Sequence, residues 1–151
     1  MTISSYGLSL ILAIIACVIG GVLGGLTLAR PGSVLGLTTL PGEGETDADA
    51  PPATGLATEG RALGGLLILS HAATALFLGY QSSVGAAMAF ALAMAWLGAA
   101  LGRAVSVLID RPRSRLNLTS LAFEVLIAIT LCLPFFNAGR LVVLRGHGML
   151  V

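Results

Sequence analysis

Four long stretches of apolar residues constrain this chain more than any other feature of its sequence. They cover about residues 6–29, 61–80, 84–109 and 118–136. A helix of about 20 apolar residues crosses the roughly 30 Å of hydrocarbon in a bilayer. Because a helix satisfies its own backbone hydrogen bonds, it is the form that such segments take in lipid. The sequence therefore predicts an all-α protein, a single integral membrane domain built as a bundle of four transmembrane helices.

Composition places the chain in a membrane rather than in water. Charged residues make up 10% of the 151 residues and apolar residues 56%, and the mean hydropathy is +0.97. A soluble domain carries about 25% charged residues. The formal net charge of +1 provides no basic field to attract phosphate backbones. We therefore expect membrane lipids around the chain and no nucleic-acid partner.

The connections between the predicted spans differ in character. Residues 30–60 contain four prolines and an acidic run, a composition that opposes regular structure and predicts a long extramembrane loop between the first two helices. Residues 79–83, Gly-Tyr-Gln-Ser-Ser, predict a tight hairpin between the second and third spans. We expect residues 139–151 to form a tail beyond the fourth span.

The arginines are distributed unevenly between the two sides of the predicted membrane domain. With four spans, both termini share one face, and the first and third connections share the other. That second face carries six of the eight basic residues. Because short cytoplasmic loops carry the Lys/Arg excess, we expect both connections in the cytoplasm and both termini in the periplasm of a bacterial inner membrane.

Small residues recur at helical spacing in three of the spans. Lipid tails are as apolar as leucine, so membrane helices associate through close packing of small residues and through polar contacts. We expect most of these positions to pack within the chain, with docking against a neighbouring subunit as the alternative. The glycines assigned to helix packing are Gly20, Gly21, Gly24, Gly25, Gly64, Gly65, Gly98 and Gly102. The third span adds a stripe of alanines, Ala87, Ala91, Ala95 and Ala99.

Charged side chains inside the spans mark the candidate site. Arg103 and Glu124 each lie about seven residues, or roughly 10 Å, from their end of the connection between the third and fourth spans, so we expect them to pair. The whole expected cluster consists of Glu59, Arg61, Arg103, Ser106, Asp110 and Glu124. It serves either as an ion-pair clasp between helices, which we favour, or as a site for a quinone head group, an anion or a proton.

A single histidine lies near the expected membrane midplane. His71 is roughly 15 Å into the second span. It either binds a haem or chlorophyll-type pigment, relays protons, or hydrogen-bonds a neighbouring carbonyl or Ser70, and we favour the last. The sequence supplies no paired nucleophile and base and no metal-ligand spacing. We therefore expect no catalytic residues, no metal and no cofactor, with quinone as the alternative cofactor.

Three short motifs occur in order along the second, third and fourth spans. They are Glu59-Gly60-Arg61-Ala62-Leu63-Gly64-Gly65, then Gly102-Arg103 with Ser106 and Asp110, then Phe123-Glu124. This order resembles a bacterial four-helix integral membrane family of unknown function, related to the DoxX-like group. Some DoxX-like proteins are linked to quinone or thiol oxidation, and the resemblance implies such a role as an alternative. The long acidic loop and the tail depart from the compact family pattern and are typical of attachment surfaces.

Two functional hypotheses follow from these patterns. The first is a non-enzymatic integral membrane protein, a small accessory or assembly subunit of a larger, energy-transducing inner-membrane complex, with other membrane subunits as its partners. The second is a DoxX-like, quinone-linked redox protein that uses Arg61, Arg103 and Glu124.

Overall fold

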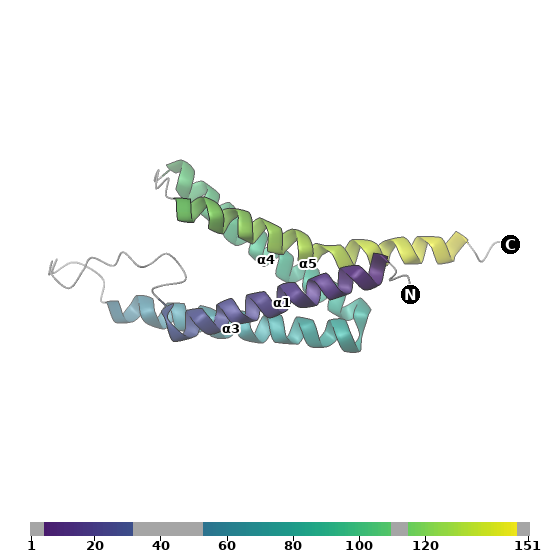
Figure 1. Cartoon of the computed structure of the whole chain (residues 1–151), viewed down its shortest axis with the longest axis horizontal. Helices are drawn as coiled ribbons and strands as arrows, with labels where there is room; N and C mark the ends of the chain where they lie inside the picture. The colour runs from purple at the N-terminus through teal and green to yellow at the C-terminus, as the bar shows by residue number, and fades with distance from the viewer. Residues whose placement is uncertain (1–4, 32–52, 110–114, 148–151) are drawn as a thin grey trace. The chain divides into compact units, whose positions relative to one another are not determined.

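The computed structural model describes residues 5–31, 53–109 and 115–147. These residues form four long α-helices and contain no strand (Figure 1). The helices are α1 (Ser5–Ala29), α3 (Ala53–Tyr80), α4 (Ser82–Ile109) and α5 (Arg115–His147). Each contains a segment long and apolar enough to cross a membrane, and these segments are Ser5–Ala29, Thr58–Tyr80, Ser82–Ile109 and Leu118–Asn137. The prediction of an all-α membrane protein with four spans is confirmed.

Two helices extend beyond their predicted limits. The sequence predicted a loop over residues 30–60, but α3 begins at Ala53. Pro51 and Pro52 precede this helix in the sequence, and proline is favoured at helix starts because its missing N–H has no partner there in any case. Residues 32–52 of the predicted loop lie outside the described residues. At the other end α5 continues to His147, so the first part of the predicted tail is helical.

The tight turn predicted over residues 79–83 joins α3 to α4. Gln81 is the single non-helical residue between them. Its N–H donates to the carbonyl of Phe77 at 2.8 Å, and the Gly85 N–H donates to the Gln81 carbonyl at 2.9 Å. A Cβ atom at Gly85 would overlap the backbone of Leu78. Glycine at this position therefore lets the first turn of α4 lie directly against the last turns of α3.

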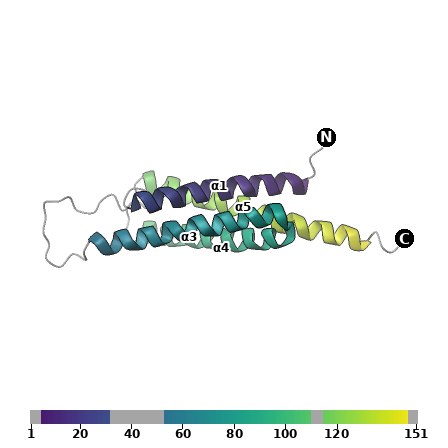
Figure 2. The ribbon, with the colours of Figure 1, turned by 90° about the horizontal axis from the view of Figure 1, so that it is seen from below.

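The chain divides into two compact units. Unit 1 comprises residues 1–18 and 72–151, and unit 2 comprises residues 19–71. The division falls within α1 and within α3, so both helices contribute to both units. Within unit 1, α4 and α5 run side by side (Figures 1 and 2).

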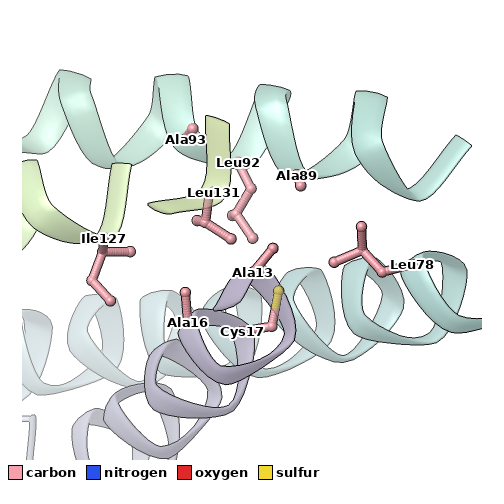
Figure 3. Close-up of a cluster of buried hydrophobic side chains, with 9 residues drawn as sticks. All are labelled: Ala13, Ala16, Cys17, Leu78, Ala89, Leu92, Ala93, Ile127 and Leu131. Carbon is pink, nitrogen blue, oxygen red and sulfur yellow. The ribbon is translucent and has the colours of Figure 1, made fainter. Parts of the chain in front are cut away.

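The core of unit 1 is built largely from small side chains contributed by all four helices. Its members are Ala13, Ala16 and Cys17 on α1, Leu78 on α3, Ala89, Leu92 and Ala93 on α4, and Ile127 and Leu131 on α5 (Figure 3). Small residues let helix backbones approach closely, and in lipid this close contact takes over from the hydrophobic effect in holding helices together. Both cysteines are free thiols, Cys17 in the core and Cys132 packed against it.

Hydroxyl groups inside the helices are satisfied by their own backbone. Ser9 Oγ donates to the Tyr6 carbonyl at 2.7 Å, and Thr27 Oγ1 donates to the Leu23 carbonyl at 2.8 Å. Throughout the described part of the chain, every buried side-chain nitrogen or oxygen has a hydrogen-bond partner. This matters in hydrocarbon, where each unsatisfied polar group costs several kcal/mol because no water replaces the missing partner.

Candidate functional site

An ion pair between α4 and α5 forms the centre of the candidate site. Arg103 Nε lies 3.0 Å from Glu124 Oε1 and 3.1 Å from Oε2, and Arg103 Nη2 lies 2.6 Å from Oε1. The Glu124 side chain is 7% exposed and the Arg103 side chain 25%. The carboxylate therefore receives donors on both oxygens from one side edge of the guanidinium, a bidentate geometry that strengthens and orients the pair. The contact expected from matched depth on the two helices is formed.

The remaining members of the expected cluster are Ser106, Glu59, Arg61 and Asp110. Ser106 is half-buried on α4, about one turn after Arg103. Glu59 and Arg61 are exposed on the first turns of α3, which belong to unit 2, whereas the ion pair belongs to unit 1. Asp110 lies outside the described residues. The structure thus describes the Arg103–Glu124 part of the cluster, and the larger assembly of charges stays a prediction.

Aromatic contacts continue the α4–α5 interface away from the ion pair, and the sequence analysis missed them. Trp96 meets Phe123 edge-on, with ring centroids 6.4 Å apart. Farther along, Phe90 stacks on Phe135 at 4.5 Å and contacts Phe136 edge-on at 6.2 Å. Aromatic pairs of these geometries contribute about 0.5–1.5 kcal/mol each beyond their burial.

A signal for one of these contacts was present in the sequence. Phe90 lies 13 residues before Arg103, and Phe135 lies 11 residues after Glu124. On sequential antiparallel helices, nearly equal distances from one known contact place two residues at similar depth. Matched depth therefore predicts a contact between Phe90 and Phe135, as it does between Arg103 and Glu124.

His71 is buried, with 1% of its surface exposed, and it is bonded to its own helix. Its Nδ1 lies 2.7 Å from the Leu67 carbonyl oxygen, which accepts a hydrogen bond from Nδ1–H. Ser70 Oγ donates to the same carbonyl at 3.2 Å. This is the bonding to a neighbouring carbonyl that we favoured from the sequence.

The opposite edge of the His71 ring packs against α1. A Cβ atom at Gly20 would overlap Nε2 and its neighbouring ring carbons. Glycine at position 20 thus provides the space that the imidazole fills. This contact accounts for the burial of His71, and the haem or chlorophyll-type alternative stays a prediction.

Glycines also bring α1 and α3 together at a second position in unit 2, around Gly24 and Gly64. A Cβ at Gly64 would lie 2.6 Å from the Leu28 nitrogen, and one at Gly24 would lie 2.8 Å from Leu67 Cβ and 2.9 Å from the Gly64 carbonyl oxygen. These distances are shorter than carbon atoms tolerate, so the two backbones approach here as closely as two glycines permit. Gly20, Gly24 and Gly64 therefore serve helix packing as expected.

The other glycines assigned to helix packing do not make such contacts. A Cβ at Gly21 would be at ordinary distance, 4.0 Å, from His71 Cβ. One at Gly25, Gly65, Gly98 or Gly102 would meet no atom within 4 Å. The alanine stripe of α4, Ala87, Ala91, Ala95 and Ala99, is likewise exposed. Gly21 thus packs within the chain at ordinary distance, whereas close packing is not formed at Gly25, Gly65, Gly98 and Gly102 or along the alanine stripe. On α4 the buried face uses a different set of small residues, among them Gly85, Ala89 and Ala93.

Comparison with known proteins places this architecture in a family. The family described as Domain of unknown function (DUF4345) matches residues 7–134. The chain belongs to the DUF4345 family. No curated protein and no solved structure matches the chain. A domain of unknown function with four membrane-capable helices agrees with that part of the resemblance drawn from the sequence motifs.

The DUF4345 match includes the ion pair and the glycine contacts described above. Arg103, Glu124, His71 and Gly20 all lie within it. Among the described residues, no group of three or more His, Cys, Asp and Glu side chains is placed to hold a metal ion. What this part of the DUF4345 domain offers chemically is an oriented ion pair on the α4–α5 interface and a set of closely packed backbones.

Proposed function

We propose that this DUF4345 protein is a non-enzymatic accessory or assembly subunit of a larger membrane complex, and that it binds a transmembrane helix of another protein through α4. The supporting observation is an exposed row of small residues, here called the outward stripe. It consists of Ala87, Ala91, Ala95, Gly98, Ala99 and Gly102. The space beside Gly98 and Gly102 is open, because an added Cβ at either residue meets no atom within 4 Å.

The outward stripe differs from the other exposed faces of unit 1. On α1 and α5 those faces carry large side chains, such as Ile15 at 50%, Val18 at 58% and Phe136 at 62% exposure. A row of small residues does not improve packing against lipid tails, whereas it lets the backbone of a second helix approach closely and pack against α4. Gly98 and Gly102 are four residues apart, a spacing that puts both on one side of α4 and suits a closely crossing helix.

The ion pair has a structural role in this proposal. Arg103 and Glu124 hold the end of α4 against α5, and the aromatic contacts hold the remainder of the same interface. Because α4 is fixed in rotation by these contacts, its small residues at Ala91, Ala95 and Gly98 are presented outward as one surface. A pre-oriented surface loses less conformational freedom on association than a mobile helix would.

The location of the complex is also part of the proposal. We infer a bacterial inner membrane with both termini in the periplasm, on the support of the arginine excess in the connections that follow the first and third spans. A reporter fused at residue 151 should report the periplasm and one placed within residues 32–52 the cytoplasm, and the reverse assignment contradicts this orientation.

Cross-linking from α4 tests the proposed function most directly. Full-length protein carrying a photoreactive residue at Ala95 should form a cross-link to one membrane protein in cells, whereas the same residue at Leu69, which is 72% exposed on α3, should not. The double variant Gly98→Leu/Gly102→Leu should lose at least about nine tenths of that product, because leucines hold the helices apart.

A matched control separates lost docking from lost folding. Gly65→Leu also places a leucine in open space within a helix, and it should leave the cross-link unchanged. A cross-link from Ala95 only to a second copy of the chain, or one that survives in Gly98→Leu/Gly102→Leu, contradicts the subunit proposal.

The DoxX-like, quinone-linked alternative receives less support. It requires Arg61, Arg103 and Glu124 to act on one quinone. Within the described part of the chain, Arg103 and Glu124 contact each other. Glu124 moreover already occupies one edge of Arg103. Quinone-dependent turnover by the purified protein that disappears in Arg103→Ala, with helical content unchanged, would favour this alternative over the first.

A further inference from the structure

The Arg103 guanidinium has a second binding edge that the ion pair leaves open. Glu124 takes the side edge, formed by Nε and one hydrogen of Nη2. The end edge, formed by Nη1 and the other Nη2 hydrogen, donates to no described residue, and the Arg103 side chain is 25% exposed. We propose that this end edge binds a phosphate oxyanion, either from a phospholipid head group or from free phosphate.

The position of Arg103 along α4 supports a phosphate ligand. Arg103 lies 21 residues after Ser82, which is about 32 Å along a helix. Ser82 follows the α3–α4 turn, and Tyr80 in that turn is 85% exposed, as is typical of an aromatic residue at a membrane surface. The hydrocarbon is about 30 Å thick, so Arg103 lies in the part of α4 nearest the opposite hydrocarbon boundary, from which a long arginine side chain reaches phosphate groups.

The chemistry of the open edge matches the same ligand. The two outer nitrogens of a guanidinium form a planar fork, which fits two oxygens of one phosphate, and arginine stays charged at any physiological pH. The fork is already oriented, because the Glu124 carboxylate fixes the plane of the guanidinium through three contacts. An oriented donor pair loses little conformational freedom when an oxyanion binds.

Electrostatics set the expected strength of the site. The carboxylate neutralises part of the arginine charge, so phosphate binding to the intact pair is moderate. Glu124 and the phosphate compete for the same Arg103 cation, so removing the charge of Glu124 strengthens phosphate binding. If the pair were purely structural, removing that charge would not strengthen phosphate binding.

The test measures ligand binding to full-length protein in detergent by native mass spectrometry. The ligands are short-chain phosphatidylglycerol, phosphatidylcholine with the same chains, and inorganic phosphate. Arg103→Lys, which keeps the charge but has no fork, should weaken phosphatidylglycerol binding by about tenfold. Glu124→Gln, which keeps the shape and an acceptor oxygen, should tighten it by about threefold to tenfold. Arg30→Lys just after the end of α1, an exposed arginine outside the expected cluster, is the matched control and should change nothing.

The outcomes separate the two sources of phosphate from failure of the proposal. Binding of phosphatidylglycerol with little response to inorganic phosphate identifies a lipid head group, whereas competition by inorganic phosphate at similar concentrations identifies a site for the free ion. Equal binding by wild type, Arg103→Lys and Arg30→Lys overturns the proposal. Weaker or unchanged binding by Glu124→Gln overturns it as well, and this second variant decides the matter if Arg103→Lys does not fold.

Discussion

Replacing Gly20 by alanine tests whether the α1–α3 contact of unit 2 is as close as the structure shows. The added methyl group would overlap the Nε2 edge of the His71 ring. The ring is buried, and its Nδ1 is held by the Leu67 carbonyl at 2.7 Å. The imidazole therefore cannot turn aside without losing this hydrogen bond.

Two costs and one gain determine the expected change in unfolding free energy for Gly20→Ala. Inserting a methyl group into a filled interior costs about 1–3 kcal/mol, and losing the His71 hydrogen bond costs about 1 kcal/mol. Alanine is a better helix former than glycine by about 0.5–1 kcal/mol, so the net loss of unfolding free energy is about 1–3 kcal/mol. With His71→Ala the ring is absent, and Gly20→Ala should then be neutral or slightly stabilising.

The assay is a double-mutant cycle on the free energy of unfolding in mixed micelles, followed by helical circular dichroism. The predicted coupling energy between Gly20→Ala and His71→Ala is about 1–4 kcal/mol. If Gly20→Ala has the same effect with and without the His71 ring, to within about 0.5 kcal/mol, the two residues do not touch and the described packing of unit 2 is wrong.

Two further predictions concern the other close contacts. Gly64→Ala should destabilise the protein by about 1–3 kcal/mol because its methyl group meets the Leu28 backbone, whereas Gly65→Ala should be neutral or stabilising, and equal melting shifts for the pair would contradict this. Arg103→Leu alone should lower the unfolding free energy by about 3 kcal/mol because it leaves the buried Glu124 carboxylate without a partner. The double variant Arg103→Leu/Glu124→Leu should recover most of that loss. A double variant as unstable as the single one would show that the unpaired charge is not the cause.

The sequence predicts some parts of this structure because the physics involved acts along one helix or one short connection. The four spans follow from hydropathy over about 20 residues. The Arg103–Glu124 contact follows because both residues lie at similar distances from one short connection, which fixes the antiparallel register of α4 and α5. Phe90 and Phe135 share that register, so their contact was predictable by the same argument.

Other parts depend on information that the sequence does not carry. The contact of Gly20 with His71 requires the register of α1 against α3, and the long segment between these helices leaves that register unconstrained. The direction of the α4 small-residue rows is also undetermined, because both Ala89 on the buried face and Ala91 on the exposed face are small and apolar. In a membrane, hydropathy does not distinguish a face that meets protein from a face that meets lipid.

An ion pair between Arg103 and Glu124 joins α4 to α5, two helices long and apolar enough to cross a membrane. Solid-state NMR of the full-length protein in lipid bilayers, with ¹⁵N-labelled arginine and ¹³C-labelled glutamate, measures this contact, and Glu124→Gln assigns the signal. Because Arg103 Nη2 lies 2.6 Å from Glu124 Oε1, we expect a distance below about 4 Å between the labelled nitrogen and the Glu124 carboxyl carbon. A distance above about 6 Å in the bilayer, beyond the reach of any direct hydrogen bond, would contradict it.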